Sequence, residues 1–555
     1  MIGTALVALT LATPIGMLLA CFSPHWRARM LGLLGWAAVP GLVAALFAEG
    51  SRLVVTTPLA FAFAMDRPAA ILVLSASILW TAGGFYAGAW FRDVADKGRF
   101  AEWWLLTLAG SLGVFLASDL VGFYLTFSVV SLAAWGLVAH DRTTDAVRAA
   151  RIYVGVALLG EAFLLMAFVL LAQSLPAGEL SIAAAVVALP GSPVAGAALA
   201  LLILGFGAKI GMVPLHFWMP PTYRAAPIPA AAVLSGAAVK AGIVGFVDFL
   251  PLQAAFPTWG AVLATAGFVS AFFGVVAGML RTDPRVVLAY SSISQMGLLA
   301  AALGTALAAG GPASVPVAWY AAMHILVKGG LFLGLGVLAA AAGGQRRLIL
   351  GCLAVLALSL AGLPLTGGYL AKLAVKPVLG DGLSGWLGIL SAIGSAMLMT
   401  HFLMLCGRQI EPVQSARITG LGPPWIAVVA ASILVPWTTS GWLDAGTLGG
   451  LGLGNIVKAL GPVLLGIGLA AFFRIRIPPR LTRLMWPPAD TDIAGESPRL
   501  SAAWIRAWAT ADAVLRRWQV ASTLLLVIAI VLGATMLRSA PAPDPTPRSA
   551  SSTSP

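Results

Sequence analysis

Charged residues are scarce in this chain, and their scarcity limits what the chain can be. Only 10% of the 555 residues are charged, whereas 60% are hydrophobic, and the mean hydropathy is +0.96. This composition excludes a soluble globular core. Apolar runs of about 20 residues recur along the chain, which is typical of an all-α, polytopic transmembrane helix bundle of about 14–16 spans. The predicted spans lie near residues 3–22, 29–49, 69–91, 103–118, 120–139, 152–174, 194–218, 228–250, 257–280, 286–307, 315–341, 348–374, 384–407, 423–438, 452–473 and 521–537.

Cysteine is also rare, with only Cys21, Cys352 and Cys406 in the whole chain. All three fall inside predicted spans without a metal-ligand spacing, so we interpret them as small apolar core residues. Neither a metal site nor a site for a cofactor such as a flavin, nicotinamide, quinone or iron–sulfur cluster is indicated. The sequence ending at Cys21 resembles a lipoprotein signal, but residues 1–20 contain no Lys or Arg, which favours a first transmembrane helix.

Acidic residues are fewer than basic ones, which gives a net charge of +13. The basic residues cluster in alternate loops, such as 142–151, 281–285 and 408–417. This alternation argues against nucleic-acid binding. By the positive-inside rule, we expect a multi-pass protein of the inner (plasma) membrane, with the basic loops in the cytoplasm and the N-terminus outside. The basic loops are expected to contact anionic lipid.

The few cations that lie inside predicted spans are the main candidates for function. A charged ammonium group at the centre of a bilayer costs at least about 2.5–3.5 kcal/mol, so such groups usually face the bundle interior or a hydrated path. The residues concerned are Lys209, Lys240, His324, Lys328 and Lys372.

Two of these lysines lie beside predicted helix breaks. Pro214 follows Lys209, and Pro364 precedes Lys372. A proline inside a span is expected to leave carbonyl groups about one turn earlier without partners, which makes a plausible ion site. The alternative at Lys209 is a simple kink with the lysine reaching to the interface. Paired interruptions in two halves indicate two inverted five-helix repeats.

The other cations lie on uninterrupted spans. Lys240 is mid-span, where the alternative to an ion pathway is a structural pair with a carboxylate. His324 and Lys328 are four residues apart, on one helical face, and two such groups cannot both be charged cheaply, which suits a proton relay. Polar hydroxyls that could extend the relay, or that could bond only to their own backbone, are those of Ser291, Ser292 and Ser294.

Taken together, these segments resemble the antiporter-like membrane subunits of respiratory complex I, Mrp-type cation/proton antiporters and membrane-bound hydrogenases. The resemblance covers roughly residues 70–410, and the segments described above occur in the same order as in family members. It implies that Lys209 is the broken-helix lysine, Lys240 the central lysine and Lys372 the terminal relay residue. His324 and Lys328 would link the two halves.

One position departs from the family pattern. Family members place a glutamate in a segment similar to Phe-Trp-Glu-Leu, but here the segment is Phe127-Ser128-Val129-Val130. Ser128 therefore stands where the partner of the broken-helix lysine is expected. Glu161, on the next span, could replace that carboxylate. Alternatively, the first site of the relay is impaired.

The motifs and composition divide the chain into predicted regions. Tryptophans among arginines after residue 474 indicate an interfacial helix on the cytoplasmic side, or else a lateral arm that docks a partner. The regions are N-terminal transmembrane helices (1–102), a first repeat (103–250), a second repeat (251–410), C-terminal transmembrane helices (411–474), a cytoplasmic interfacial segment (475–520), a last transmembrane helix (521–538) and a disordered tail (539–555).

The resemblance implies a proton-translocating, or Na⁺/H⁺-antiporting, subunit of a larger membrane complex, with other membrane subunits as partners. Such a chain would be at most a non-redox subunit of a proton-pumping oxidoreductase. A second interpretation is a membrane scaffold that docks a soluble enzyme, with transport impaired at Ser128. A stand-alone transporter of an organic solute is a third.

Overall fold

The fold comes from a computed structural model, which describes residues 1–55, 61–92, 94, 99–176, 178–409, 418–443 and 452–476. Most of these residues are helical. The helices are α1 (Ile2–Ala20), α2 (Pro24–Leu33), η1 (Leu34–Ala38), α3 (Val39–Phe47), α4 (Arg67–Trp90), α5 (Phe100–Leu116), α6 (Leu120–Val138), α7 (Thr144–Gln173), α8 (Ile182–Ala188), η2 (Leu189–Gly191), α9 (Ala195–Ile210), η3 (Leu215–Trp218), α10 (Met219–Ala225), α11 (Ile228–Val233), η4 (Leu234–Ala238), α12 (Lys240–Phe249), α13 (Pro257–Met279), α14 (Pro284–Ala309), α15 (Ser314–Ala340), α16 (Gly343–Ala361), α17 (Gly367–Leu379), α18 (Leu383–Gln409), α19 (Ile418–Thr438), η5 (Ser440–Trp442) and α21 (Leu453–Arg476).

The prediction of a polytopic helical membrane protein is confirmed. Within the described residues, 14 helices are long and apolar enough to cross a membrane. The predicted span 103–118 corresponds to α5, which is shorter than the others. The predicted single span 348–374 is two helices, α16 and α17, with a break between them. The predicted span 521–537 and tail 539–555 lie outside the described residues, as does nearly all of the predicted interfacial segment.

A short hairpin of two antiparallel strands, β1 (Arg52–Val55) and β2 (Phe61–Ala64), joins α3 to α4. Asp119 fixes this hairpin to the bundle. One of its carboxylate oxygens accepts a hydrogen bond from the Ala62 nitrogen at 2.6 Å, and the other caps α6 by accepting one from the Gly122 nitrogen at 2.7 Å. The carboxylate thus satisfies a helix end and a strand at once.

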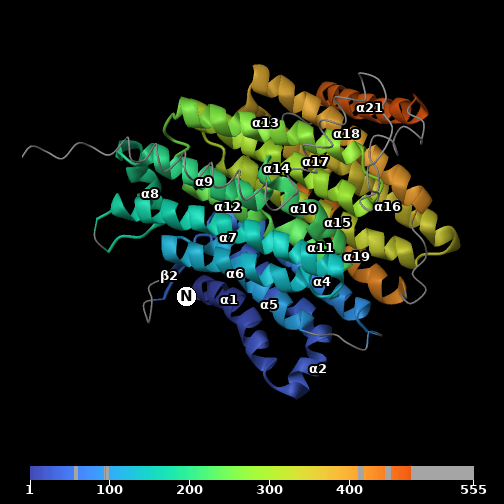
Figure 1. The fold of residues 1–555 in the computed structure, drawn as a ribbon, viewed down its shortest axis with the longest axis horizontal. Helices are drawn as coiled ribbons and strands as arrows, with labels where there is room; N and C mark the ends of the chain where they lie inside the picture. The colour runs from blue at the N-terminus through green and yellow to red at the C-terminus, as the bar shows by residue number, and fades with distance from the viewer. Residues whose placement is uncertain are drawn as a thin grey trace, which may run out of the picture.

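The centre of the bundle is formed by α15, which packs against α4, α11, α16, α17 and α19. Its membrane-spanning stretch is completely buried, as is that of α11 to α12. Figure 1 shows α1 and α2 (blue) at one edge of the bundle and α21 (red) at the opposite edge. The helices that carry Lys240, His324 and Lys328 therefore lie inside the protein, whereas α7, which carries Glu161, has one exposed face.

Small residues allow the closest helix contact, between α13 and α14. A methyl group on Gly297 would lie 2.6 Å from the Gly267 carbonyl oxygen and 2.7 Å from the Ala271 nitrogen. These distances leave no room for a side chain, so the two backbones approach as in other membrane helix pairs that use small residues.

Gly297→Ala is expected to destabilise the protein by about 1–3 kcal/mol, because α13 and α14 must separate to admit the methyl group. Gly351→Ala is the matched control. It also lies within a helix, but nothing stands within 4 Å of the added methyl group. Thermal unfolding of the purified protein in detergent measures both variants. Equal melting temperatures would contradict the close contact.

Candidate functional site

The predicted interruption beside Lys209 is present. Helix α9 ends at Ile210, and Gly211 takes the left-handed conformation with φ 70°. The chain then continues through Pro214 into η3 and α10. Lys209 lies in the last turn of α9 and is only 7% exposed.

Two carbonyl groups in the last turn of α9 have partners beyond the helix end. The Gly207 carbonyl accepts a hydrogen bond from the Met212 nitrogen at 2.8 Å, and the Ala208 carbonyl accepts one from the Trp218 indole at 2.9 Å. The chain that continues the broken helix therefore satisfies part of its end, as the membrane interior requires. The carbonyl groups closer to Pro214 remain the predicted ones.

The ammonium group of Lys209 points into the bundle rather than toward the interface. It donates to the Ser131 hydroxyl at 2.8 Å. It also lies 5.3 Å from the centre of the Phe127 ring and 6.0 Å from that of Tyr153, within the range of cation–π attraction. A small cavity beside it, lined in part by Gly160 and Gly205, has room for about one water molecule.

Glu161 lies close enough to Lys209 to act on it electrostatically, and Ser128 and Ser131 lie near its carboxylate. The Ser128 hydroxyl makes no hydrogen bond to a described residue. Glu161 is 5% exposed. Its Oε1 has no hydrogen-bond partner in the described part of the chain. Ser131 thus connects the two charged groups. Sequence reasoning missed this residue, although it lies one turn after Ser128 on the same helix and so faces the same way.

The helix that carries Lys240 contains a π-helical turn, η4, directly before it. The Val239 nitrogen bonds to the Leu234 carbonyl, five residues earlier, at 3.1 Å. The ammonium group of Lys240 donates to the Ser235 carbonyl at 2.8 Å and is completely buried. No ion pair with a carboxylate occurs at Lys240 within the described residues. π-helical turns are rare and often mark functional sites.

Hydrogen bonds bring Lys240 and Lys328 into one link across three helices, although both ammonium groups donate to backbone carbonyls, which cannot pass on a proton. The hydroxyls of Ser235 and Ser292 are 3.1 Å apart. Ser292 donates to the Leu288 carbonyl at 3.2 Å, and the Lys328 ammonium group donates to the same oxygen at 2.7 Å. Of the three predicted hydroxyls, Ser292 joins this link. Ser291 and Ser294 are buried beside it, and the Ser294 hydroxyl makes no hydrogen bond to any described residue.

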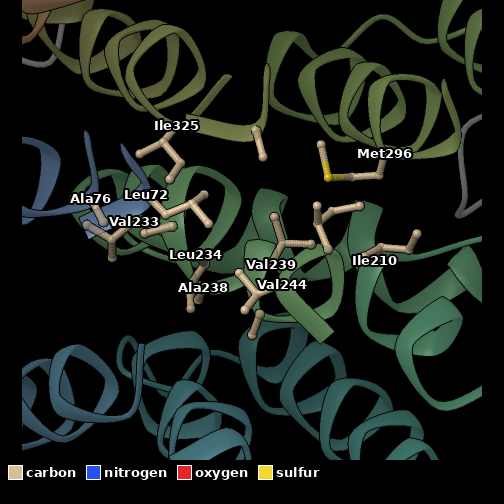
Figure 2. Close-up of a cluster of buried hydrophobic side chains, with 14 of the residues drawn as sticks. Leu72, Ala76, Ile210, Val233, Leu234, Ala238, Val239, Val244, Met296 and Ile325 are labelled. Carbon is tan, nitrogen blue, oxygen red and sulfur yellow. The ribbon is translucent and has the colours of Figure 1, made fainter. Parts of the chain in front are cut away.

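An apolar shell lies around the segment that carries Lys240. Figure 2 shows the buried side chains that gather around α11, η4 and α12. They come from α4, α9, α14 and α15 as well as from the central segment itself. This shell comprises Leu72, Ala76, Ile210, Val233, Leu234, Ala238, Val239, Val244, Met296 and Ile325.

His324 lies one turn before Lys328 on α15 and is 1% exposed. Neither of its ring nitrogens has a hydrogen-bond partner among the described residues. It lines a second small cavity with Tyr320, Leu360 and Gly368, which again has room for about one water molecule. The imidazole therefore faces the gap between α15 and the second broken helix.

The second break lies between α16 and α17 and contains Pro364. Gly362 and Leu365 both have positive φ, at 97° and 65°. The ammonium group of Lys372 donates to the Ala361 carbonyl at 2.6 Å. At this break the donor to the carbonyl group at the helix end is a lysine, whereas at the first break it is the Trp218 indole.

The structure thus places Glu161 with Lys209 in one group, and Lys240 with Lys328 and His324 in a second. Lys372 lies at the second break. The three cysteines are free. Within the described residues, no three His, Cys, Asp or Glu side chains are placed to hold a metal ion.

Comparisons with known proteins match the part of the chain that carries these groups. The model of the family described as NADH:quinone oxidoreductase/Mrp antiporter, TM, matches residues 117–400, just over half of the chain and the part that carries all these groups. Hydrogenase-4 component B of Escherichia coli (strain K12) is 31% identical over 288 residues, covering 49% of this chain and 43% of that protein. NADH-quinone oxidoreductase subunit N of Desulforudis audaxviator (strain MP104C) is 29% identical over 384 residues, covering 65% of this chain and 73% of that protein.

The fold has a counterpart among solved structures. A chain in the structure of the Mrp complex from Dietzia sp. DQ12-45-1b superposes with a TM-score of 0.68 at 22% identity, covering 98% of this chain and 63% of that chain. This likeness concerns the fold alone. The chain spans less than half the length of the first curated relatives it matches.

Trp218→Phe is expected to lower the free energy of unfolding by about 1–3 kcal/mol, because the buried Ala208 carbonyl then has one partner fewer at the break. Trp386→Phe, at a position 65% exposed, serves as the control. Thermal unfolding in detergent compares the two. A melting temperature for Trp218→Phe no lower than that of the control would show that the indole does not hold the break.

Proposed function

This chain belongs to the NADH:quinone oxidoreductase/Mrp antiporter transmembrane family, and on that premise we propose that it moves protons across a membrane as one subunit of a larger complex. The observation that carries the proposal is the hydrogen-bonded link from Lys240 to Lys328. It brings two buried cations next to the Ser235 and Ser292 hydroxyls. Because both ammonium groups donate to carbonyl oxygens, proton transfer along the link needs water or a change of hydrogen-bond partners. Buried ionisable groups in series are what a proton relay needs.

The relay begins at the first broken helix. Glu161 and Lys209 share a proton through the Ser131 hydroxyl or through water in the adjoining cavity. Glu161 thereby takes the role of the carboxylate that Ser128 lacks. The electrostatic interaction of Glu161 with Lys209, and the Ser131 hydroxyl to which Lys209 donates, support this role.

The step from Lys209 to Lys240 crosses from α9 to α12. Helices α9 and α12 are in close contact there, since a methyl group on Gly242 would lie 2.9 Å from the Phe206 carbonyl oxygen. The apolar shell around Lys240 contains no polar side chain that could pass on a proton. A proton therefore crosses this step only when water enters or the helices shift, which makes the shell a gate.

Repulsion between cations drives the later steps. Lys240, His324 and Lys328 are near enough to act on one another electrostatically. In an apolar interior, two such groups cannot both stay charged at low cost. A proton that arrives at Lys240 therefore favours release from Lys328 or His324, and onward transfer to Lys372.

The partners we propose are other membrane subunits, because the relatives are components of such assemblies by their names. Redox chemistry, where it is coupled, belongs to those partners. We also propose an inner-membrane location with the N-terminus outside, anionic lipid at the basic loops, and two inverted repeats around the two breaks. Whether Na⁺ is exchanged for H⁺ is decided by transport assays with and without Na⁺.

Lys240→Ala is expected to abolish proton transport and to leave the amount of protein in the membrane unchanged, because it removes the buried cation at one end of the link. Proton uptake by inverted membrane vesicles is measured with a pH-sensitive dye, beside an immunoblot. Lys458→Ala removes an exposed lysine on α21 and should transport normally. Wild-type transport by Lys240→Ala would exclude Lys240 from the pathway and favour the scaffold interpretation.

Glu161→Gln is expected to impair transport, because removing one charge of a buried interacting pair typically costs about 3–5 kcal/mol. Ser128→Glu in the same protein should restore part of the loss by supplying a carboxylate from α6. Glu179→Gln, which alters an exposed glutamate between spans, is the control. A double variant no better than Glu161→Gln would indicate that Glu161 does not replace the missing carboxylate.

A further inference from the structure

A second chain of polar side chains leaves the relay at α15 and crosses to α14 and α18. The Tyr320 hydroxyl donates to the Gln295 side-chain oxygen, and the Gln295 nitrogen donates to the Ser395 hydroxyl at 2.8 Å. Ser395 donates in turn to the Ser391 carbonyl at 2.8 Å. These bonds join three helices, and none of them belongs to the link between Lys240 and Lys328.

The inner end of this chain meets His324. Tyr320 lies one turn before His324, and both line the cavity that has room for about one water molecule. The His324 side chain is buried, with only 1% of its surface exposed. Neither of its ring nitrogens makes a hydrogen bond to a described residue. Two unsatisfied ring nitrogens facing such a cavity are suited to bind a water, which would also reach the Tyr320 hydroxyl.

Beyond Ser395, further hydroxyl groups follow the same helix toward the surface. Ser384, Ser391 and Ser395 follow one another at spacings of seven and four residues, which place them on one face of α18. Ser384 is partly exposed, and its hydroxyl lies 3.4 Å from that of Thr305, near the end of α14. This end of the bundle carries the connections 310–313 and 380–382.

These side chains bond from one helix to another, unlike hydroxyl groups that bond only to the backbone of their own helix. Gln295 and Tyr320 are 1% and 3% exposed, and a buried amide or phenol is expensive unless it is bonded. Apolar side chains at these positions would hold the helices together without that cost. The Ser391 hydroxyl is also completely buried, and it bonds to no described residue.

We propose that this face of α18, with Thr305, Gln295 and Tyr320, is a water-accessible branch that connects His324 to the end of the bundle at residues 310–313 and 380–382. Protons would pass along it on water and hydroxyl groups, as the hydronium ion or by hopping. Gln295 is a positioning residue, because its amide holds Tyr320 and Ser395 in place and does not itself carry the proton. The transport role rests on the proposed function, but water access does not.

Thiol accessibility tests the branch directly. Ser391→Cys and Ser395→Cys are made in a full-length protein whose three native cysteines are replaced. Membranes are treated with 2-(trimethylammonium)ethyl methanethiosulfonate, whose permanent charge keeps it from crossing the bilayer, and the remaining thiols are counted by a gel shift with a polyethylene glycol maleimide. Because only a hydrated thiol ionises and reacts quickly, both cysteines should react several-fold faster than a cysteine in a dry interface.

Ala396→Cys is the matched control. It is next to Ser395, at the same depth and also completely buried, but it faces α21, where a methyl group on Gly466 would lie 2.6 Å from the Ala396 side chain. Equal reaction rates for Ser391→Cys, Ser395→Cys and Ala396→Cys would overturn the proposal. Vesicles of opposite orientation show from which side of the membrane the reagent reaches the cysteines. A faster reaction from the side on which α14 begins, opposite to residues 310–313, would also overturn the proposal.

Tyr320→Phe tests the transport role. It removes one hydroxyl and keeps the ring, so proton transport should fall several-fold at unchanged abundance. Reactive cysteines in a protein that transports no protons would uphold the branch and refute the proposed function. Unreactive cysteines, together with normal transport by Tyr320→Phe, would refute the branch and leave the proposed function intact.

Discussion

Every backbone polar group inside a membrane must find a partner within the protein, and this constraint shapes the whole site. At the first break the Trp218 indole bonds the Ala208 carbonyl, and at the second the Lys372 ammonium group bonds the Ala361 carbonyl. In the π-helical turn, Lys240 bonds the Ser235 carbonyl. Two of the three irregular segments are therefore held by a group that can also lose a proton, so the backbone and the relay depend on each other.

The sequence alone predicted the features that stand out against an apolar background. Lys209, Lys240, Lys328 and Lys372 are visible because a lysine inside a hydrophobic run is costly. The helix breaks at Pro214 and Pro364 are visible because proline lacks a backbone donor. The number and type of the spans follow from hydropathy in the same way.

The partners of these residues could not be predicted, because they come from distant parts of the chain. Ser131 is 78 residues from Lys209, and the Leu288 carbonyl is 40 residues from Lys328. The π-helical turn before Lys240 leaves no sequence signal that we recognise, since Leu234 to Ala238 would also suit an ordinary helix. Glu161 was visible as a buried carboxylate, but its place beside two serine hydroxyls depends on how α6 packs on α7.

The apolar shell around Lys240 has an electrical consequence. Membrane voltage falls mainly across the parts of a protein that exclude water and ions, and the shell in Figure 2 is such a part. A proton that crosses it moves through much of the field, which is worth about 2.3 kcal/mol per elementary charge at 100 mV. At the step from Lys209 to Lys240, the membrane potential would then oppose or assist the movement of the proton. Steps along hydrated stretches would be nearly independent of voltage.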